Sequence, residues 1–504
     1  KQISLSNGNL DFQNSPTLSN SSSLSVESGE LIFQSGATIS GSSLDFTSSS
    51  FKPSGTVSFE SSINFMFDPD SSVVLEGDTT IAMEGDGFSW PSLDLNGNNL
   101  TLAGNIEYMI VEGAMSIGTG ESLNSGTVYL TLDSTLTIDD GGILSSGSGL
   151  VQIVEALTLN GFLVQGGGIL NLISGGSVGT TGELDVEDSE LKLGDELTFA
   201  GTLVVNSGTT WSGLGGTVDL STGTLESGGG TFNLDAFTIG ANSTFRLSGD
   251  TEISSADDLT LGYLELGGNT LSLDFASVGN ATLILPNTLA MDTAGSIIDT
   301  GDSSLTLSNP LNINAGSIAS TGGTLSFAGG LTLGAEGALD VTDSTFSVSQ
   351  ALNLSTASFT SSVLDLQAAT TLSSGGLVHF GSLTTNGNVL TLGSASTHLK
   401  LNDALTLNGV ALETGAGSLT LLDTLSLSNS AALNSTGGTI TLGSGASVPS
   451  GTSISLPDTT LVLQNDLSLT GGTLKTKNTT FTTNSNALSL SESSTLEVEG
   501  VQDL

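Results

Sequence analysis

The sequence has no cysteine, 2 histidines and 7 lysines and arginines among its 504 residues. Without cysteine there is no disulfide and no thiolate to hold zinc, and two histidines far from any partner ligand argue against a zinc site. The 51 aspartates and glutamates give a formal net charge of −44. Such a chain repels phosphate backbones and anionic lipid, so we expect no nucleic-acid partner and no attraction to membrane surfaces.

Charged residues make up 12% of the chain and aromatic residues 5%, while Gly, Ser, Thr and Asn are abundant. These residues are poor helix formers, so the composition argues against an α-rich fold. Disorder is the other possibility at this net charge, but the mean hydropathy is +0.22 and large apolar residues recur at regular spacing. No run approaches the ~18 apolar residues that span a bilayer. Because the sequence opens at Lys1 without Met or an apolar leader, we expect an exported mature product or an excised fragment.

A repeat of about 21 residues dominates the C-terminal half. Triplets of apolar, polar and apolar residues form three interleaved series with this common period. The first series begins at Leu399, Leu419, Ile440, Leu461 and Phe481. The second begins at Leu405, Leu425, Val448, Leu467 and Leu488, and the third at Leu412, Leu433, Ile454, Leu474 and Leu496. Three series with one period predict three strands per repeat.

The same phases extend upstream. They continue as Leu305, Leu325, Phe346 and Leu364, as Leu311, Leu331, Leu352 and Leu372, and as Ile318, Leu339, Phe359 and Val378. Two short steps near Leu383 and Leu390 shift the phase without ending the pattern. Whole words also recur, since Ala156 to Gly161 is repeated letter for letter at Ala404 to Gly409.

Triplets such as Leu157-Thr158-Leu159 have the alternation of a half-buried strand, with Leu inward and Thr outward. Gly, Asn, Asp and Ser between them suit tight corners. The sequence therefore predicts an all-β fold, a three-faced parallel β-helix or β-solenoid with about 21 residues per coil. We expect less regular coils or a cap over residues 1–130, where Phe and Pro are concentrated, and a regular solenoid continuous with it over 131–504.

The Gly-Gly-Thr words at Gly322 and Gly437, the Leu-Thr-Leu words and the acidic, cysteine-free composition resemble the passenger regions of bacterial autotransporter and filamentous-haemagglutinin-like proteins. The stretch from Ser320 to Val341 is similar to an autotransporter-associated strand repeat, although it lacks the tyrosine that often precedes Gly-Gly-Thr there. A C-terminal translocator barrel is not expected within the sequence, since Val498 to Leu504 lacks the alternating strands of one. The resemblance implies an extracellular rod for adhesion, coating or fibre building.

Parallel β-helices also include lyases and glycosidases, so the residues must decide whether chemistry is possible. A lyase acting on acidic sugars needs Lys or Arg at its centre, and we expect the single arginine, Arg246, to point outward into solvent or a salt bridge. Glycoside hydrolysis needs two carboxylates at fixed separation. The paired acids are expected at corners, as turn residues: Asp68/Asp70, Glu76/Asp78, Glu84/Asp86, Asp139/Asp140 and Asp257/Asp258.

Other possible sites are equally weak. The Gly-x-Ser-x-Gly match around Ser177 is expected by chance, and we interpret Ser177 as a corner residue. His379 lies between Val378 and Phe380 and is expected to face solvent. Calcium is the one ion to consider, at the acidic strip Glu183, Asp185, Glu187, Asp188 and Glu190, but a solvated acidic face is the favoured interpretation.

We therefore expect no catalytic and no cofactor-binding residues. The favoured hypothesis is an extracellular structural or adhesive β-solenoid at the cell surface, a subunit of a fibre, sheath or stalk that is not an enzyme. Its expected partners are further copies of itself, in a fibre or surface layer, or ligands on host or neighbouring cells. The alternative is a carbohydrate-active or carbohydrate-binding β-helix, of tailspike or lyase type, and an ice-binding solenoid with threonine ladders ranks last.

Overall fold

The computed structural model describes residues 2–19, 23–41, 43–60, 63–85, 87–206, 208–213, 217–220, 222–235, 237–275, 281–355 and 357–502. Every regular element in these ranges is a β-strand, which confirms the predicted all-β class. Within the same ranges no helix has the length and apolar character needed to cross a membrane.

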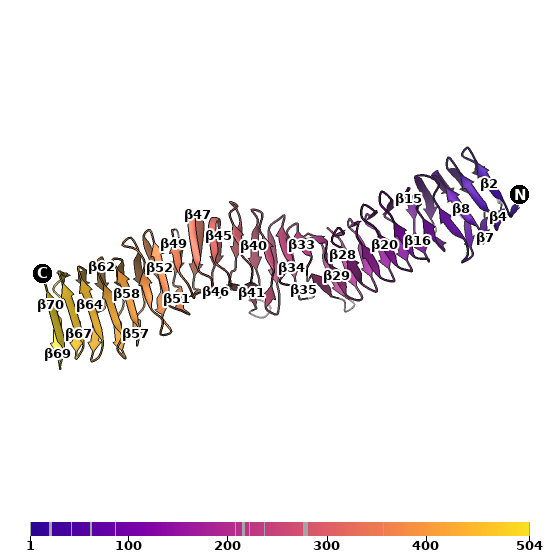
Figure 1. The fold of residues 1–504 in the computed structure, drawn as a ribbon. Helices are drawn as coiled ribbons and strands as arrows, with labels where there is room; N and C mark the ends of the chain where they lie inside the picture. The colour runs from indigo at the N-terminus through magenta and orange to yellow at the C-terminus, as the bar shows by residue number, and fades with distance from the viewer. Residues whose placement is uncertain are drawn as a thin grey trace. The chain divides into compact units, whose positions relative to one another are not determined.

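The chain forms two compact units. The first comprises residues 1–230 with 236–246, and the second comprises residues 231–235 with 247–504. In each unit short parallel strands stack side by side as a β-solenoid, as Figure 1 shows for the indigo to magenta and the orange to yellow coils. The change in regularity expected near residue 130 stays a prediction.

Three strands make one coil in the first unit, because each strand pairs with the strand three places further along the chain. One face begins with β1 (Gln2–Ser6), β4 (Ser23–Glu27), β7 (Ser43–Thr47) and β10 (Asn64–Phe67). Another contains β13 (Phe88–Trp90), β16 (Tyr108–Val111), β19 (Tyr129–Leu132), β22 (Leu150–Ile153), β25 (Ile169–Leu172) and β28 (Glu190–Leu193). Partners in register lie about one repeat apart, as Ile3 and Leu24 do. The three-faced coil is thus confirmed.

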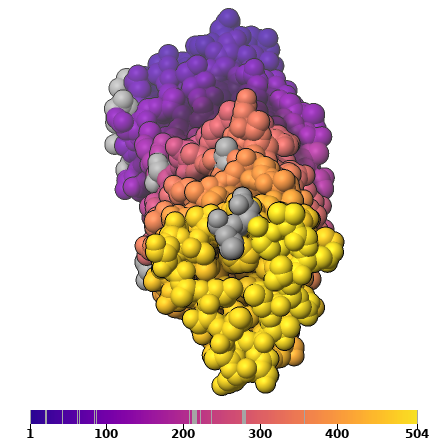
Figure 2. Space-filling view, turned by 90° about the vertical axis from the view of Figure 1, so that its left-hand side faces the viewer, coloured from indigo at the N-terminus to yellow at the C-terminus, as the bar shows by residue number. Residues whose placement is uncertain are grey.

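In each unit the core is a column of apolar side chains inside the coils. Inward residues such as Leu31, Leu163, Leu325 and Leu419 are fully buried. Each contributes roughly 1.5–3 kcal/mol of favourable transfer free energy when buried. Figure 2 shows the last coils, in yellow, as a densely packed surface at the C-terminal end of the chain.

In the second unit two faces carry the strongest repeat. One consists of β53 (Leu377–Phe380), β56 (His398–Leu401), β59 (Ser418–Leu421), β62 (Thr439–Leu442), β65 (Thr460–Leu463) and β68 (Thr480–Thr482). The other consists of β57 (Leu405–Asn408), β60 (Leu425–Ser428), β63 (Ala446–Pro449), β66 (Leu467–Thr470) and β69 (Leu488–Ser491). The register aligns Leu399, Leu419, Ile440, Leu461 and Phe481, which confirms the first predicted series.

Two positions in the predicted series are wrong. Ala446, not Val448, is the register partner of Leu425, because the corner after β62 brings a small residue into the first inward position. Phe359 pairs with Val341 rather than with Leu339, whose partner is Ala357. In both cases the alternation is right and the pairing is displaced by two residues.

Two long strands remove a predicted corner. β45 (Leu311–Ser320) and β47 (Leu331–Thr342) each run through two of the expected triplets and pair with one another along most of their length. The register shifts between Ile313 and Ala315, where a bulge replaces the turn. Over these coils the second and third faces are continuous.

Candidate functional site

Arg246 and His379 lie where the alternation places them. Arg246, on β36 (Thr244–Leu247), is exposed, and its guanidinium lies 3.3 Å from a carboxylate oxygen of Glu226. His379 points outward from β53, half-buried, with its Nε2 hydrogen-bonded to Asn402 Oδ1 at 2.7 Å. The outward orientation expected for both residues is confirmed.

Ser177 is not a corner residue. It lies in the middle of β26 (Gly176–Val178), exposed, in register with Thr158 and Thr198. Gly175 belongs to the corner before this strand, with a φ of 64° that glycine adopts freely. No histidine lies in register with Ser177, so a nucleophile–base pair is not formed there.

The paired acids lie at corners with one exception. Glu84 belongs to β12 (Thr79–Gly85), because pairing with β15 (Asn99–Ile106) continues as far as Gly85. Asp86 lies outside the described residues. The other pairs fall between strands, as expected.

Corner aspartates have a structural role that sequence reasoning missed, since they accept hydrogen bonds from backbone amides of adjacent coils. Asp68 accepts from Ser48 N at 2.9 Å, Asp258 from Thr282 N at 2.8 Å and Asp466 from Ala487 N at 2.7 Å. Each bond joins residues 20 to 24 positions apart. Hydrogen bonds from Ser71 and Ser48 lower the pKa of Asp68 below its ordinary value. These carboxylates stabilise the stack and are already hydrogen-bonded.

The acidic strip considered as a calcium site lies in the first unit. Glu183 and Asp185 are on β27 (Glu183–Asp185), Glu187 and Asp188 form the next corner, and Glu190 starts β28. Burial, followed by the charges of Asp185 and Glu226, raises the pKa of Glu183. Among the residues the structure describes, no group of three or more His, Cys, Asp or Glu side chains is placed to hold a metal ion. A solvated acidic face stays the favoured interpretation, and calcium binding stays the alternative.

An open groove of about 590 Å³ on the second unit is lined by four carboxylates, those of Glu252, Asp274, Asp299 and Asp302. Local donors already engage them. Asp299 accepts a hydrogen bond from Gly301 N at 3.1 Å, and Asp302 accepts one from Thr321 Oγ1 at 3.4 Å. The groove is a polar surface of the coil stack without a convergent acid–base pair.

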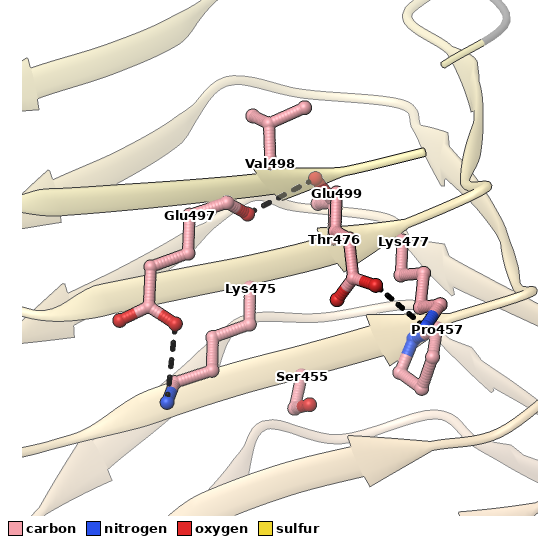
Figure 3. Close-up of a pocket in the computed structure, with 8 residues that line it drawn as sticks. All are labelled: Ser455, Pro457, Lys475, Thr476, Lys477, Glu497, Val498 and Glu499. Carbon is pink, nitrogen blue, oxygen red and sulfur yellow. Dashed lines mark hydrogen bonds and ion pairs between the residues drawn. The ribbon is translucent and has the colours of Figure 1, made fainter. Parts of the chain in front are cut away.

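A smaller pocket of about 240 Å³ lies over the last strands, β67 (Thr473–Lys477) and β70 (Thr495–Glu499). Figure 3 shows that its charges are paired across the two strands. Lys475 Nζ lies 3.2 Å from Glu497, and Lys477 Nζ lies 2.7 Å from Glu499. Each pair is in register, so the pocket is framed by two interstrand ion pairs.

The face formed by β53, β56, β59, β62, β65 and β68 has no outward carboxylate, and neither has the face of the same coils formed by β57, β60, β63, β66 and β69. On the first of these faces two residues of each strand point outward, and none of them is a carboxylate: Leu377, His379, His398, Lys400, Ser418, Thr420, Thr439, Thr441, Thr460, Val462, Thr480 and Thr482. We call this surface the carboxylate-free face. It holds both histidines of the chain and one of its few lysines.

The basic residues on this face are neighbours. Lys400 is the register partner of His379 on β53 and of Thr420 on β59. His398 Nε2 is hydrogen-bonded to Thr420 Oγ1 at 2.8 Å, and burial, then the charge of Lys400, lowers the pKa of His398. Within the described part of the chain Lys400 has no carboxylate within ion-pair distance. Lys52, Lys192, Arg246, Lys475 and Lys477 are all paired.

The 21-residue period could have found this cluster, since His379 and Lys400 are 21 positions apart and both outward. The structure thus offers two features to a partner: corners whose acids are already hydrogen-bonded, and a face without acids that carries Lys400 and both histidines. No family model matches the chain, and neither the curated proteins nor the solved structures contain a match.

Proposed function

We propose that the protein is an extracellular structural or adhesive β-solenoid, a subunit of a cell-surface fibre, sheath or stalk that works through its outer faces without catalysis. The observation that supports this proposal is that many charged groups of the protein are already engaged in hydrogen bonds and ion pairs within it. Corner carboxylates such as Asp258 and Asp466 hold neighbouring coils together, and five of the cations are in ion pairs. A long apolar column with such a surface provides rigidity and a repeated outer face.

Labelling of intact cells tests the location. An antibody against the purified protein is expected to bind unpermeabilised cells, and protease added outside is expected to remove the signal. An antibody that binds only after permeabilisation, with the protein protected from external protease, would show that the location is wrong.

The alternative, a carbohydrate-binding β-helix, has one specific observation in its favour. Tyr108 and Tyr129 are register partners on β16 and β19 and are 42% and 54% exposed. Beside their column, Asn171 Nδ2 donates a hydrogen bond of 3.0 Å to Gln152 Oε1. Aromatic faces next to amides suit the apolar and hydroxyl faces of a sugar ring.

A polysaccharide panel separates the two functions. We expect neither new reducing ends nor unsaturated products from neutral or acidic polysaccharides. Retention of the protein on an immobilised glycan, abolished in Tyr108→Ala/Tyr129→Ala and unchanged in Tyr263→Ala, would favour the alternative without turnover. Product release by the wild type would overturn the non-catalytic proposal.

A further inference from the structure

The carboxylate-free face carries one cation without an ion-pair partner among the described residues, on a strongly negative protein. Lys400 lies in the middle of it with His379 as register partner and His398 on its own strand. Leu377, at its edge, is 54% exposed. β59 adds only the hydroxyls of Ser418 and Thr420, and the nearest acid in the sequence, Asp403, follows β56 at the corner. What distinguishes this face from the equally carboxylate-free face of β57, β60, β63, β66 and β69 is its cluster of Lys400 and the two histidines.

The first unit carries a surface of the opposite kind. Glu183, Asp185, Glu187 and Asp188 are half-buried or exposed and contribute to no ion pair found among the described residues. Burial and the charges of Asp185 and Asp188 raise the pKa of Glu187, which shows that these carboxylates are crowded. We call these four residues the acidic surface. A cation from outside would relieve their mutual repulsion.

We propose that the carboxylate-free face of one copy docks onto the acidic surface of a second copy of this chain, with Lys400 and the two histidines against Glu183, Asp185 and Glu187. The charges are complementary, and both surfaces belong to parallel stacks with the same step of about 4.8 Å between coils. His398 and Lys400 lie two residues apart on β56, and Glu183 and Asp185 lie two residues apart on β27, so the two pairs have the same spacing along a strand, about 6.6 Å.

Overall repulsion between two copies of charge −44 does not prevent this contact. At physiological ionic strength the Debye length is about 8 Å, so charges far from the contact are screened and the local charges decide. Because the two docking surfaces are different, the contact is heterologous. Such contacts build open chains of subunits unless the rotation between successive subunits closes a ring. The inference rests on the proposed fibre function and names the surfaces that would make the fibre.

The contact has a defined dependence on pH and salt. The ordinary pKa of histidine is about 6.5, and burial, then the charge of Lys400, lowers the pKa of His398. Acidification toward pH 5.5 therefore adds positive charge to His398 beside Lys400, at the acid end of the range, while most carboxylates stay ionised. Association is therefore expected to strengthen from pH 8 to pH 5.5 and to weaken in 0.5 M salt.

Sedimentation velocity of the purified full chain tests the proposal. At pH 6 and low salt the wild type is expected to form large species, and Lys400→Glu to weaken association about tenfold or more, the range of close interfacial charge pairs. The matched control is Lys475→Gln compared with Lys400→Gln. Both remove one positive charge, but Lys475 lies outside the carboxylate-free face and is already paired with Glu497. Only the Lys400 variant should reduce association.

A charge exchange gives the sharpest result. Lys400→Glu mixed with Glu183→Lys/Glu187→Lys should assemble again, since one copy then supplies the missing cations, while each variant alone stays small. Thermal unfolding confirms that the variants are folded. Assembly of Lys400→Glu as strong as that of the wild type would overturn the named surfaces and leave the fibre function standing. If the wild type stays monomeric under all conditions and instead binds the polyanion heparin, the proposal that a second copy of the chain binds this face is wrong.

Discussion

Lys477 Nζ lies 2.7 Å from a carboxylate oxygen of Glu499, its register partner on the neighbouring coil. This hydrogen bond, with the charge of Glu499, raises the pKa of Lys477 above its ordinary value. The pair links β70 to β67 through side chains as well as through the backbone. Both residues are exposed, so their contribution is local.

Removing this pair is expected to loosen the last strand. In Lys477→Gln, amides of Thr495–Glu499 should exchange faster with deuterium, while amides of β59 and β62 keep the wild-type rate. Because the pKa of Lys477 is raised in the folded state, its stabilisation is present below about pH 10.5 and is lost above it. Unchanged exchange in β70 would show that the backbone ladder alone holds that strand.

The alternation of inward and outward residues predicts opposite effects at adjacent positions. Leu325→Ala should lower the free energy of unfolding by about 2–5 kcal/mol, because Leu325 is fully buried in the column. Ser326→Ala, one residue along β46 (Thr324–Phe327), should change it by less than about 0.5 kcal/mol. Urea titrations of both variants check this, and similar losses at both positions would contradict the assigned orientation.

The hydrogen bonds to the corner aspartates predict that the free energy of unfolding decreases at acid pH. The backbone amide of Ala256 donates a hydrogen bond of 2.7 Å to Asp235 and lowers the pKa of that carboxyl. Its stabilisation is therefore present above pH 3.8 and is lost as pH falls through the lowered folded-state pKa. Asp235→Ala should cost at most about 1 kcal/mol at pH 7, since the group is exposed, and nothing near pH 2. A loss that persists at pH 2 would assign the effect to something other than the charge.

For Glu183 we expect the opposite dependence of stability on pH. Its raised pKa means that the folded state holds the proton more tightly than the unfolded chain, so ionisation destabilises the fold as pH rises through the raised pKa. Glu183→Gln should stabilise the protein at pH 7 by about 0.5 kcal/mol or less, after allowance for solvent screening, and this gain should vanish at pH 4 and below. Thermal unfolding at the two pH values measures it, and an equal gain at both would exclude electrostatic relief.

The repeat predicts which deletions are tolerated. Ile440 and Leu461 are register partners 21 residues apart, so removing residues 440–460 takes out one coil and joins equivalent positions. The shortened protein should keep its β-sheet circular dichroism and cooperative unfolding. Removing residues 440–449 places outward residues in the column and should abolish cooperative unfolding. Equal stability of the two deletions would contradict the coil register.

Much of the fold was predictable because each triplet reports which residues face inward. The series through Leu399 and Leu419 was placed correctly by its period alone. The errors at Val448 and Phe359 have one cause. Alternation shows which residues face inward but not which of them are register partners on adjacent coils, because the length of the corner between strands decides the register. The long strand β45 was missed because a bulge at Ile313 leaves the same apolar pattern as a turn.

The candidate surface was less accessible to sequence reasoning. A face without acids becomes visible only when outward residues are sorted by face, as for Ser418 and Thr439. The bond between Asp466 and the amide of Ala487 links two irregular corners, whose geometry no periodicity describes. Both features depend on how the coils are aligned in space.

Electron microscopy of the native protein tests the central claim most directly. Surface material from producing cells and the purified full chain, both labelled with the same antibody, should show filaments or a layer in which individual solenoids repeat. Isolated monomers in solution at pH 6, together with unlabelled cell surfaces, would contradict the account of this protein as a surface-assembling β-solenoid.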